Sequence, residues 1–262
     1  MSIEDVIICG ECASEIKKLD DESIDLVVTS PPYDDLRKYN GYSWNFEDVA
    51  TGLSRVIKRG GVIVWVVGDK TVGGSETGRS MKQALFFKDQ CGLLLYDTMI
   101  YRKHNPVPTG KGRYYQSWEF MFVFSKGRPK TFNPIFEPRR NACNDKRTHR
   151  VKSFNRSSDG VAKKVECKIR DSVPRQNVWT YKVGGGNSTK DRMAHGHPAI
   201  FPSQLAADHI QSWSNHGDLV LDPFCGSGTT VIEAKKMERK YIGIEISEEY
   251  CNLIKKRMDI SV

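Results

Sequence analysis

Short apolar runs alternate with helical patterns along most of the 262-residue chain, and this alternation constrains the fold more than any other feature. Strands joined by helices of this length pair in parallel, so we expect an α/β fold in which helices cover both faces of a mostly parallel sheet. The pair Gly60-Gly61 is expected to end the helix predicted at 46–57. Apolar runs and 3.6-residue repeats predict strands at 6–9, 24–29, 62–67, 96–101, 118–125, 219–221 and 241–246, and helices at 12–19, 46–57, 80–89, 202–213, 229–237 and 248–258.

A basic stretch without long periodic runs interrupts this alternation. Residues 137–175 contain 12 Lys or Arg against 5 Asp or Glu, a net charge of +7, whereas the whole chain carries +8. Because the excess is concentrated, we expect an inserted lobe that follows a phosphate backbone. The alternative is a solvated or disordered surface loop.

The sign of the net charge indicates an acidic partner. A charge of +8 and a pI near 9.0 favour nucleic acid over a membrane. No run approaches the ~18 apolar residues of a membrane span, and the first ten residues lack a signal-peptide pattern. We therefore expect a cytoplasmic protein with a nucleic-acid partner and no membrane partner.

The cysteines argue against a disulfide framework, because their number is odd and they are scattered through predicted core segments. Cys9 and Cys12 have the CxxC spacing of a redox or zinc site. A zinc site needs a second pair of ligands, and His195 with His197 is the candidate, nearly the whole chain away. We expect no metal.

The segment VVTSPPYDDL, residues 27–36, places two prolines directly after an apolar strand. Each proline fixes its φ angle and lacks an N–H, and the residue before a proline is pushed out of the α region. The carbonyls of Ser30 and Pro31 are therefore rigid acceptors.

A second motif, LVLDPFCGSGTTVIEA, runs from Leu219 to Ala234. A strand ends at Asp222, and the turn Gly226-Ser227-Gly228 opens a helix at Thr229, which lets a ligand approach the backbone closely. The motif lacks the Gly-Lys-Ser/Thr of a P-loop and the third glycine of a dinucleotide fingerprint.

Glu245 follows Gly226 by 19 residues, at the end of the next predicted strand. An acidic residue at this spacing is placed to accept hydrogen bonds from a ribose. A nucleoside without a pyrophosphate fits these features, and S-adenosylmethionine is such a ligand. Asp222 has two open interpretations, a cap for the following turn or a contact to the cofactor, and a side chain at Gly228 is expected to enter the ligand's space.

TSPPY and DPFCGSGTT, in this order, resemble the amino-methyltransferases that act on DNA, and the resemblance covers residues 7–258. SPPY is similar to the cytosine-N4 branch, whereas adenine-N6 enzymes usually carry Asp or Asn before Pro-Pro-Tyr. A catalytic motif that precedes the cofactor motif is typical of the permuted group called beta. The resemblance implies a seven-stranded, Rossmann-like, circularly permuted methyltransferase fold, with a catalytic half at 1–132, a target-recognition insert at 133–196 and a cofactor-binding half at 197–262.

The resemblance also implies roles for individual residues. Ser30, Pro31, Pro32 and Tyr33 form the catalytic motif: the Ser30 hydroxyl and the Pro31 carbonyl accept the hydrogens of the target amine, and Tyr33 stacks on the extruded base. Glu11 stands where the family carries an Asp that holds adenine, and Phe201 lies in an HPxxxP cofactor segment. The expected cofactor-binding residues are Glu11, Phe201, Asp222, Phe224, Cys225, Gly226, Gly228, Thr229 and Glu245, and the expected DNA-binding residues are Arg139, Arg140, Arg147 and Arg150. Tyr39, Trp44 and Trp179 could stack on bases, but most aromatic residues belong to the core, so they are left out of the site.

We therefore expect a site-specific enzyme that transfers a methyl group from S-adenosylmethionine to cytosine N4 in double-stranded DNA, by base flipping and direct displacement. Adenine N6 is the alternative target, and RNA is a weaker third. Two other classes stay open, a catalytically inactive nucleic-acid-binding module and a nicotinamide-dependent dehydrogenase. The sequence also leaves open whether a partner restriction endonuclease exists and whether the protein is a monomer or a homodimer.

Overall fold

The computed structural model describes residues 3–32, 44–106, 112–138, 150–156, 160–168, 171–184, 188–189, 193 and 201–260. The chain forms two compact units. The larger unit combines Met1–Asn133 with Asn177–Val262, and the smaller unit is Pro134–Gln176.

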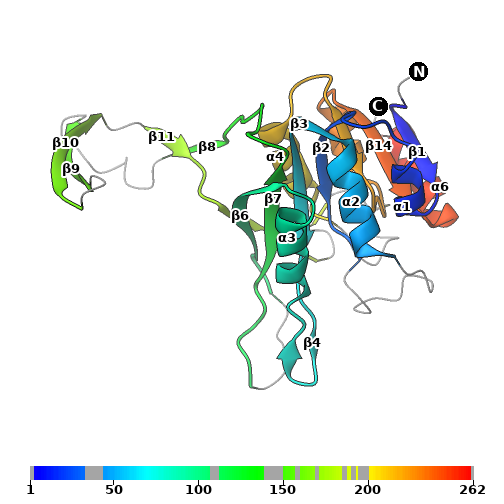
Figure 1. The fold of residues 1–262 in the computed structure, drawn as a ribbon, viewed down its shortest axis with the longest axis horizontal. Coiled ribbons are helices and arrows are strands. Elements are labelled where there is room, and N and C mark those ends of the chain that lie inside the picture. Colours follow the sequence, from blue (N-terminus) through cyan, green and yellow to red (C-terminus); the bar gives the residue numbers. More distant parts are fainter. Residues whose placement is uncertain are drawn as a thin grey trace. The chain divides into compact units, whose positions relative to one another are not determined.

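An eight-stranded sheet forms the centre of the larger unit (Figure 1), in the order β1-β14-β13-β2-β3-β7-β6-β12. Every neighbouring pair is parallel except the two that involve β7. The strands are β1 (Val6–Cys9), β2 (Ile24–Thr29), β3 (Ile57–Val67), β6 (Leu94–Lys103), β7 (Trp118–Ser125), β12 (Val178–Tyr181), β13 (Leu219–Asp222) and β14 (Lys240–Glu245). The predicted mostly parallel α/β fold is confirmed, but the expected count of seven strands is wrong because β12 adds an eighth beside β6.

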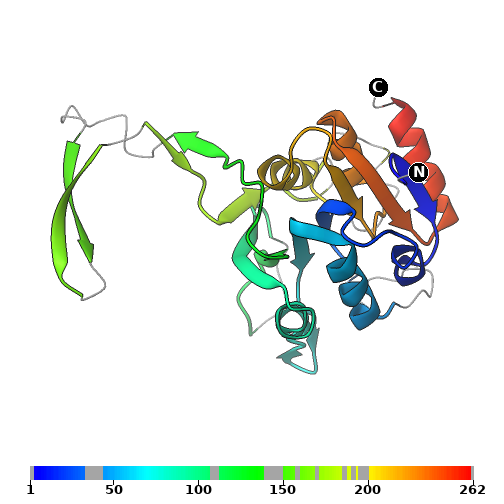
Figure 2. The ribbon, with the colours of Figure 1, turned by 45° about the horizontal axis from the view of Figure 1, so that its top comes forward.

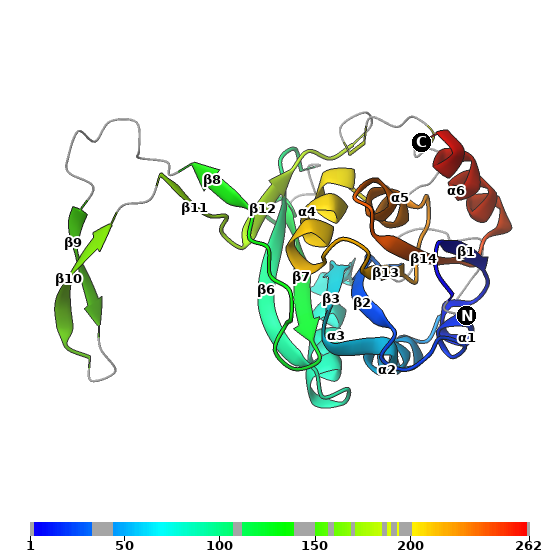
Figure 3. The same ribbon diagram turned by 90° about the horizontal axis from the view of Figure 1, so that it is seen from above.

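Helices cover both faces of this sheet, as the alternation predicts. Figure 3 shows α1, α2 and α3 on one face and α4, α5 and α6 on the other. In Figures 1 and 2, α6 lies beside β1 at one edge of the sheet. The helices are α1 (Cys12–Ile16), α2 (Phe46–Val56), α3 (Arg79–Asp89), α4 (Ser203–Trp213), α5 (Thr229–Lys236) and α6 (Glu248–Ile260).

The end of α2 differs from the sequence prediction. Asn45 caps the helix by accepting hydrogen bonds from the N–H groups of Glu47 and Asp48, but the helix ends at Val56 and Ile57 is already extended. Gly60 and Gly61 therefore lie inside β3 and do not end α2. The pairing register between β2 and β3 shifts at this point, and the left-handed φ of +79° at Gly60 explains why a glycine is needed in a strand here.

The core between the sheet and its α2–α3 face contains a cluster of aromatic side chains. Trp65 of β3 is fully buried and packs edge-on against Phe87 of α3 with ring centroids 5.2 Å apart. Its indole N–H donates to the Gln83 side chain at 3.0 Å, so its polar atom is satisfied. This packing holds the central strands β2 and β3, whose ends carry the candidate site.

The smaller unit consists of two antiparallel strand pairs in its described part. β8 (Phe136–Pro138) pairs with β11 (Ser172–Pro174), and β9 (Arg150–Arg156) pairs with β10 (Ala162–Lys168). The unit is shorter than the expected insert at 133–196, because Val178–Tyr181 belongs to the main sheet. Arg150 is the first residue of β9, and Arg139, Arg140 and Arg147 lie outside the described residues.

Candidate active site

The carboxyl ends of four neighbouring parallel strands bring the sequence motifs together. β2 ends before Ser30, β13 ends at Asp222 and β14 ends at Glu245. Cys9 at the end of β1 pairs with Glu245, and Asp222 pairs with Gly243. In an open parallel sheet this edge is where ligands bind, so the two motifs that lie almost 200 residues apart form one candidate site.

Asp222 connects β2, the strand that ends before Ser30, to the glycine turn. Its Oδ1 accepts hydrogen bonds from the Thr29 hydroxyl at 2.7 Å and from the Phe224 N–H at 3.1 Å. Burial raises the pKa of Asp222 to about 6, although the Thr29 and Thr230 hydroxyls and the Phe224 N–H favour the ionised form. The sequence predicts that Asp222 either caps the following turn or contacts the cofactor. The hydrogen bond from the Phe224 N–H shows that it caps the turn.

Glu245 holds the glycine turn as well as ending β14. One carboxylate oxygen accepts the Gly226 N–H at 2.7 Å, and the other accepts the Ser247 N–H at 2.9 Å. Burial raises the pKa of Glu245, and these backbone donors oppose the shift. A carboxylate has about four lone-pair sites, so Glu245 retains acceptor capacity for a hydroxyl group of a ligand.

The glycine turn packs tightly against α6. Gly226 and Gly228 have left-handed φ angles of +54° and +84°. A Cβ atom at Gly228 would lie 2.8 Å from Cγ2 of Ile254, which is fully buried in α6. The expectation that a side chain here would enter the ligand's space is therefore wrong, since it would first collide with the helix.

Arg257, a buried residue of α6 that is not among the predicted site residues, supports the same turn. Its guanidinium donates to the Ser227 carbonyl. Arg257 lies three residues after Ile254, on the buried apolar stripe of α6, whereas the neighbouring Lys255 and Lys256 are exposed. A cation on the apolar stripe of a predicted helix is the signal that would have found it.

Cys225 and Thr229, two further expected site residues, are buried at the turn. The Cys225 N–H donates to the Ile244 carbonyl at 2.9 Å, which fastens the turn to β14. Burial raises the pKa of the Cys225 thiol well above its usual value, so this thiol is unreactive as a nucleophile. Thr229 begins α5.

Glu11 caps α1 at the end of β1. Its carboxylate accepts the N–H groups of Ala13 at 2.9 Å and Ser14 at 2.8 Å. Partial burial opposes ionisation, but these hydrogen bonds outweigh it and lower the pKa of Glu11. The neighbouring Gly10 N–H donates to the Glu245 carbonyl at 2.9 Å, so Glu11 lies beside the candidate ribose-binding residue.

Aromatic side chains flank the site. Phe224 packs edge-on against Trp44 with ring centroids 4.8 Å apart. Trp44 also contacts Trp65, so its assignment to the core is correct, yet it reaches the cofactor motif as well. Phe201 is half-buried directly before Pro202, which precedes α4. Trp179, also assigned to the core, is buried.

The catalytic motif starts where β2 ends. Ser30 and Pro32 are half-buried and Pro31 is buried, whereas Tyr33 lies outside the described residues. Pro31 is therefore fixed both by its own ring and by its surroundings, as a rigid acceptor requires.

No group of three or more His, Cys, Asp or Glu that could hold a metal ion occurs among the described residues. His195 and His197 lie outside them. Within the same residues, no helix is long and apolar enough to span a membrane.

A family model described as DNA methylase, of the N6/N4 methyltransferase type, matches residues 24–256. The chain belongs to the N6/N4 DNA methylase family. It is 52% identical over 244 residues to the orphan methyltransferase M.BamHII of Bacillus amyloliquefaciens, covering 92% of this chain and 91% of the relative. It is 28% identical to the type II methyltransferase M.SmaI of Serratia marcescens, covering 96% of this chain and 90% of that protein.

Solved structures share the fold of this methylase. PvuII DNA methyltransferase, named as cytosine-N4-specific, matches with a TM-score of 0.68 at 19% identity, covering 98% of this chain and 87% of that one. A putative DNA modification methylase of Thermus thermophilus, solved with S-adenosyl-L-methionine, matches with a TM-score of 0.64 at 22% identity, covering 98% and 93%.

Family membership confirms a DNA methyltransferase that uses S-adenosylmethionine. The residues at the sheet edge fit this cofactor chemically. Ribose hydroxyls and a sulfonium cation need acceptors and negative charge, and the buried Asp222 and the half-buried Glu245 supply two carboxylates at one edge. The backbone N–H groups of Phe224 and Gly226 donate to these two carboxylates and hold the turn between them.

Proposed function

We propose that this methylase modifies the exocyclic N4 amine of cytosine in a specific sequence of double-stranded DNA. The observation that carries the proposal is the serine before the two prolines, at the carboxyl end of β2 and next to the strands that hold Asp222 and Glu245. A short hydroxyl side chain stands here in place of the carboxylate or amide of adenine enzymes. The fold shared with the PvuII enzyme, named as cytosine-N4-specific, supports the same choice.

The chemistry requires a free lone pair on the amine, which in cytosine is delocalised into the ring. In the proposal, the Ser30 hydroxyl and the Pro31 carbonyl each accept one amino hydrogen and draw the nitrogen toward a tetrahedral geometry. S-adenosylmethionine, when bound, supplies a methyl group that its sulfonium already activates. As the N–C bond forms and the C–S bond breaks, Ser30 and Pro31 hold the amine in line until its proton passes to solvent.

The flipped cytosine and the cofactor need separate binding residues. We assign Tyr33 to stacking on the flipped base and Glu245 to the ribose diol. Glu11 and Phe201 would contact the adenine. The rest of the cofactor would be surrounded by Asp222, Phe224 and the turn from Cys225 to Thr229.

The basic unit supplies DNA contacts in this proposal. Arg139, Arg140, Arg147 and Arg150 would neutralise phosphates, and the recognition region would extend through 133–196 around the compact unit Pro134–Gln176. Phosphate contacts position a protein on DNA but do not read its sequence, so base recognition must come from other side chains.

Nucleoside analysis of DNA from cells that express the chain tests the proposal. N4-methylcytosine should appear, and single-base mapping should place it in one sequence context. N6-methyladenine alone would overturn the choice of cytosine and leave the DNA methylase assignment intact. A Ser30→Ala variant serves as the matched control and should give little product.

A further inference from the structure

Two segments of the larger unit extend from the sheet edge that carries the catalytic motif. β3 ends at Val67, which pairs with Phe120 near the start of β7, and Thr29 of β2 pairs with Trp65 of β3. The segment that leaves β3 and the segment that enters β7 therefore start at the same edge as Ser30. Figure 1 shows the hairpin that contains β4 extending away from this edge.

The first segment is a short hairpin with a rigid base. β4 (Thr71–Val72) pairs with β5 (Ser75–Glu76), and the Thr77 N–H extends the pairing to the Lys70 carbonyl at 2.9 Å. At the base, the carboxylate of Asp69 accepts the Thr77 hydroxyl at 2.9 Å and both the N–H and the hydroxyl of Ser80. Partial burial opposes ionisation of Asp69, but the hydrogen bonds from Ser80 and Thr77 outweigh it and lower its pKa.

The tip of the hairpin is narrow and is braced by the second segment. Gly73 and Gly74 have left-handed φ angles, and a Cβ atom on either would meet nothing within 4 Å. Arg113 donates to the Gly74 carbonyl and pairs with Glu76 at 4.0 Å. We call residues 69–80 and 112–118 together the hairpin arm.

The hairpin arm exposes large apolar side chains on this rigid support. The exposed fraction is 57% for Val72, 56% for Tyr115 and 101% for Tyr114. The acids of the arm are engaged within it, since Asp69 holds the hairpin base and Glu76 pairs with Arg113. The arm therefore presents apolar side chains with basic ones such as Lys70 beside the place where a DNA duplex must be opened.

We propose that the hairpin arm inserts into the target duplex and fills the space left by the flipped base, with Val72 and Tyr115 as the inserted side chains. The inference rests on the proposed function, because an enzyme that extracts a base must stabilise the gap that remains. Apolar and aromatic wedges between base steps are a general solution to this cost. A narrow glycine tip suits a groove, and a braced hairpin loses little conformational freedom on binding.

A second copy of the chain is the competing occupant of an exposed apolar surface. The position of the arm favours DNA, because the arm starts from the same edge as the catalytic motif and is not on a helix face. Met81 and Leu85 of α3, with exposed fractions of 53% and 54%, are comparable exposed apolar side chains on a helix outside the arm.

The test compares single-turnover methylation of a matched duplex with that of a duplex whose target cytosine is mismatched. A mismatched base is already easy to extrude. Val72→Ala with Tyr115→Ala should lower the rate on the matched duplex by about tenfold or more, the scale of one lost stacking contact, and the mismatch should restore most of it. S-adenosylmethionine affinity should stay the same, and Leu85→Ala should behave as the unmodified protein.

Several outcomes would overturn the inference. An unchanged methylation rate of the double variant on the matched duplex would overturn it. A lower rate that the mismatch does not restore would also overturn it, since that would indicate a structural role for the two side chains. A change of oligomeric state in the double variant without DNA would assign the arm to a second copy. If the unmodified protein methylates no DNA, the proposed function fails instead, so the two failures are distinguishable.

Discussion

The carboxylate of Glu245 accepts the backbone N–H of Gly226 at 2.7 Å, so the residue proposed to bind the ribose also holds the turn that faces it. In the proposed site, ligand binding and the geometry of the turn therefore depend on the same side chain. Replacing Glu245 removes both an acceptor for the ligand and the hydrogen bond that shapes the turn.

Glu245→Ala should weaken S-adenosylmethionine binding by ~1–3 kcal/mol, the usual scale for a lost partner of a buried polar group. Glu245→Gln keeps an oxygen that can accept one hydrogen bond, so its affinity for S-adenosylmethionine should lie between that of the unmodified protein and that of Glu245→Ala. Calorimetric titration measures both, with Asp89→Ala on the surface of α3 as the control. Equal affinities in all variants would remove Glu245 from the cofactor site.

Gly228→Ala should destabilise the fold. The left-handed backbone costs about 1–3 kcal/mol for a residue with a Cβ atom, and the contact with Ile254 adds overpacking of about 1–3 kcal/mol. Denaturant unfolding measures the loss. In a double-mutant cycle, Ile254→Ala should make the two effects less than additive, because it removes the collision. Additive effects would contradict the packing of the turn against α6.

Asp222 gives a defined pH dependence, because burial raises its pKa from 3.8 to about 6. The folded protein then binds more protons at this site than the unfolded chain, so its contribution to stability falls as the pH rises from about 4 to about 6. Asp222→Asn removes this titration. The unfolding free energy of the variant relative to the unmodified protein should therefore increase by about 2–3 kcal/mol across that window. A difference independent of pH would show that Asp222 does not titrate there.

Ser30→Ala should slow the chemical step while leaving cofactor affinity unchanged. Losing one pre-organised polar contact to a transition state typically costs ~2.7–4 kcal/mol, about a hundred- to thousandfold in rate. Single-turnover methylation gives the rate, and calorimetry gives the affinity. Ser54→Ala is the matched control, because Ser54 is a half-buried serine near the end of α2 whose hydroxyl donates to the Thr51 carbonyl. A normal rate in Ser30→Ala would exclude the hydroxyl as an acceptor for the amine.

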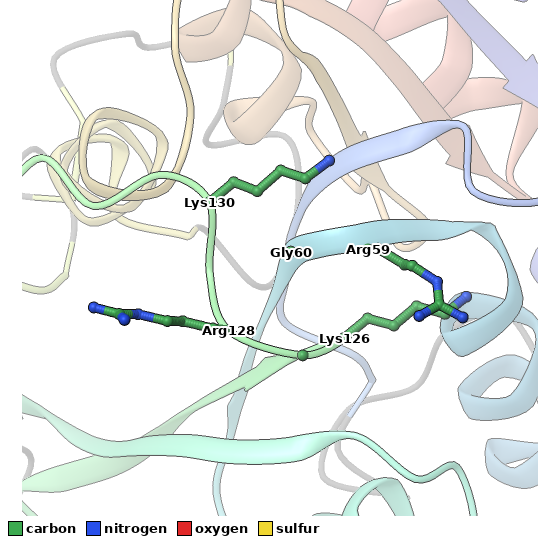
Figure 4. Close-up of a pocket in the computed structure, with 6 residues that line it drawn as sticks. Arg59, Gly60, Lys126, Arg128 and Lys130 are labelled. Carbon is green, nitrogen blue, oxygen red and sulfur yellow. The ribbon is translucent and has the colours of Figure 1, made fainter.

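Replacing Arg139, Arg140, Arg147 and Arg150 by Gln should weaken DNA binding and flatten its salt dependence by about 0.9 per lost phosphate contact. The larger unit offers a basic control at the amino ends of its strands, opposite the strand ends that carry the catalytic motif. Figure 4 shows Arg128 and Lys130 at a pocket of about 360 Å³ near the start of β3. Replacing these two by Gln should leave the slope unchanged. If the slope responds to the control and not to the four arginines, the basic unit is not the phosphate contact.

Local patterns predicted most of the elements because each depends on neighbouring residues. The apolar repeat that begins at Phe46 and the capping side chain of Asn45 define the start of α2 without reference to the rest of the chain. The motif strands ending at Thr29 and Asp222 were likewise visible as buried runs followed by turn residues.

The remaining features depend on contacts between distant segments. Gly60-Gly61 looks like a helix stop, but pairing with β2 places it inside a strand. Val178–Tyr181 looks like part of the insert, but it pairs with β6. The support of Ser227 by Arg257 depends on how α6 packs against the turn, because the two residues are 30 positions apart in the sequence.

The two connections to the smaller unit are both fastened to the larger one. The Asn133 N–H donates to the Ser212 carbonyl at 2.8 Å, and the Asn177 carbonyl accepts the Ile100 N–H at 2.8 Å. The segment between them can therefore be lengthened, shortened or exchanged during evolution without disturbing the sheet that holds the reacting groups. If the smaller unit recognises the target, as we propose, its exchange between related enzymes would change the DNA sequence that is methylated and leave the chemistry unchanged.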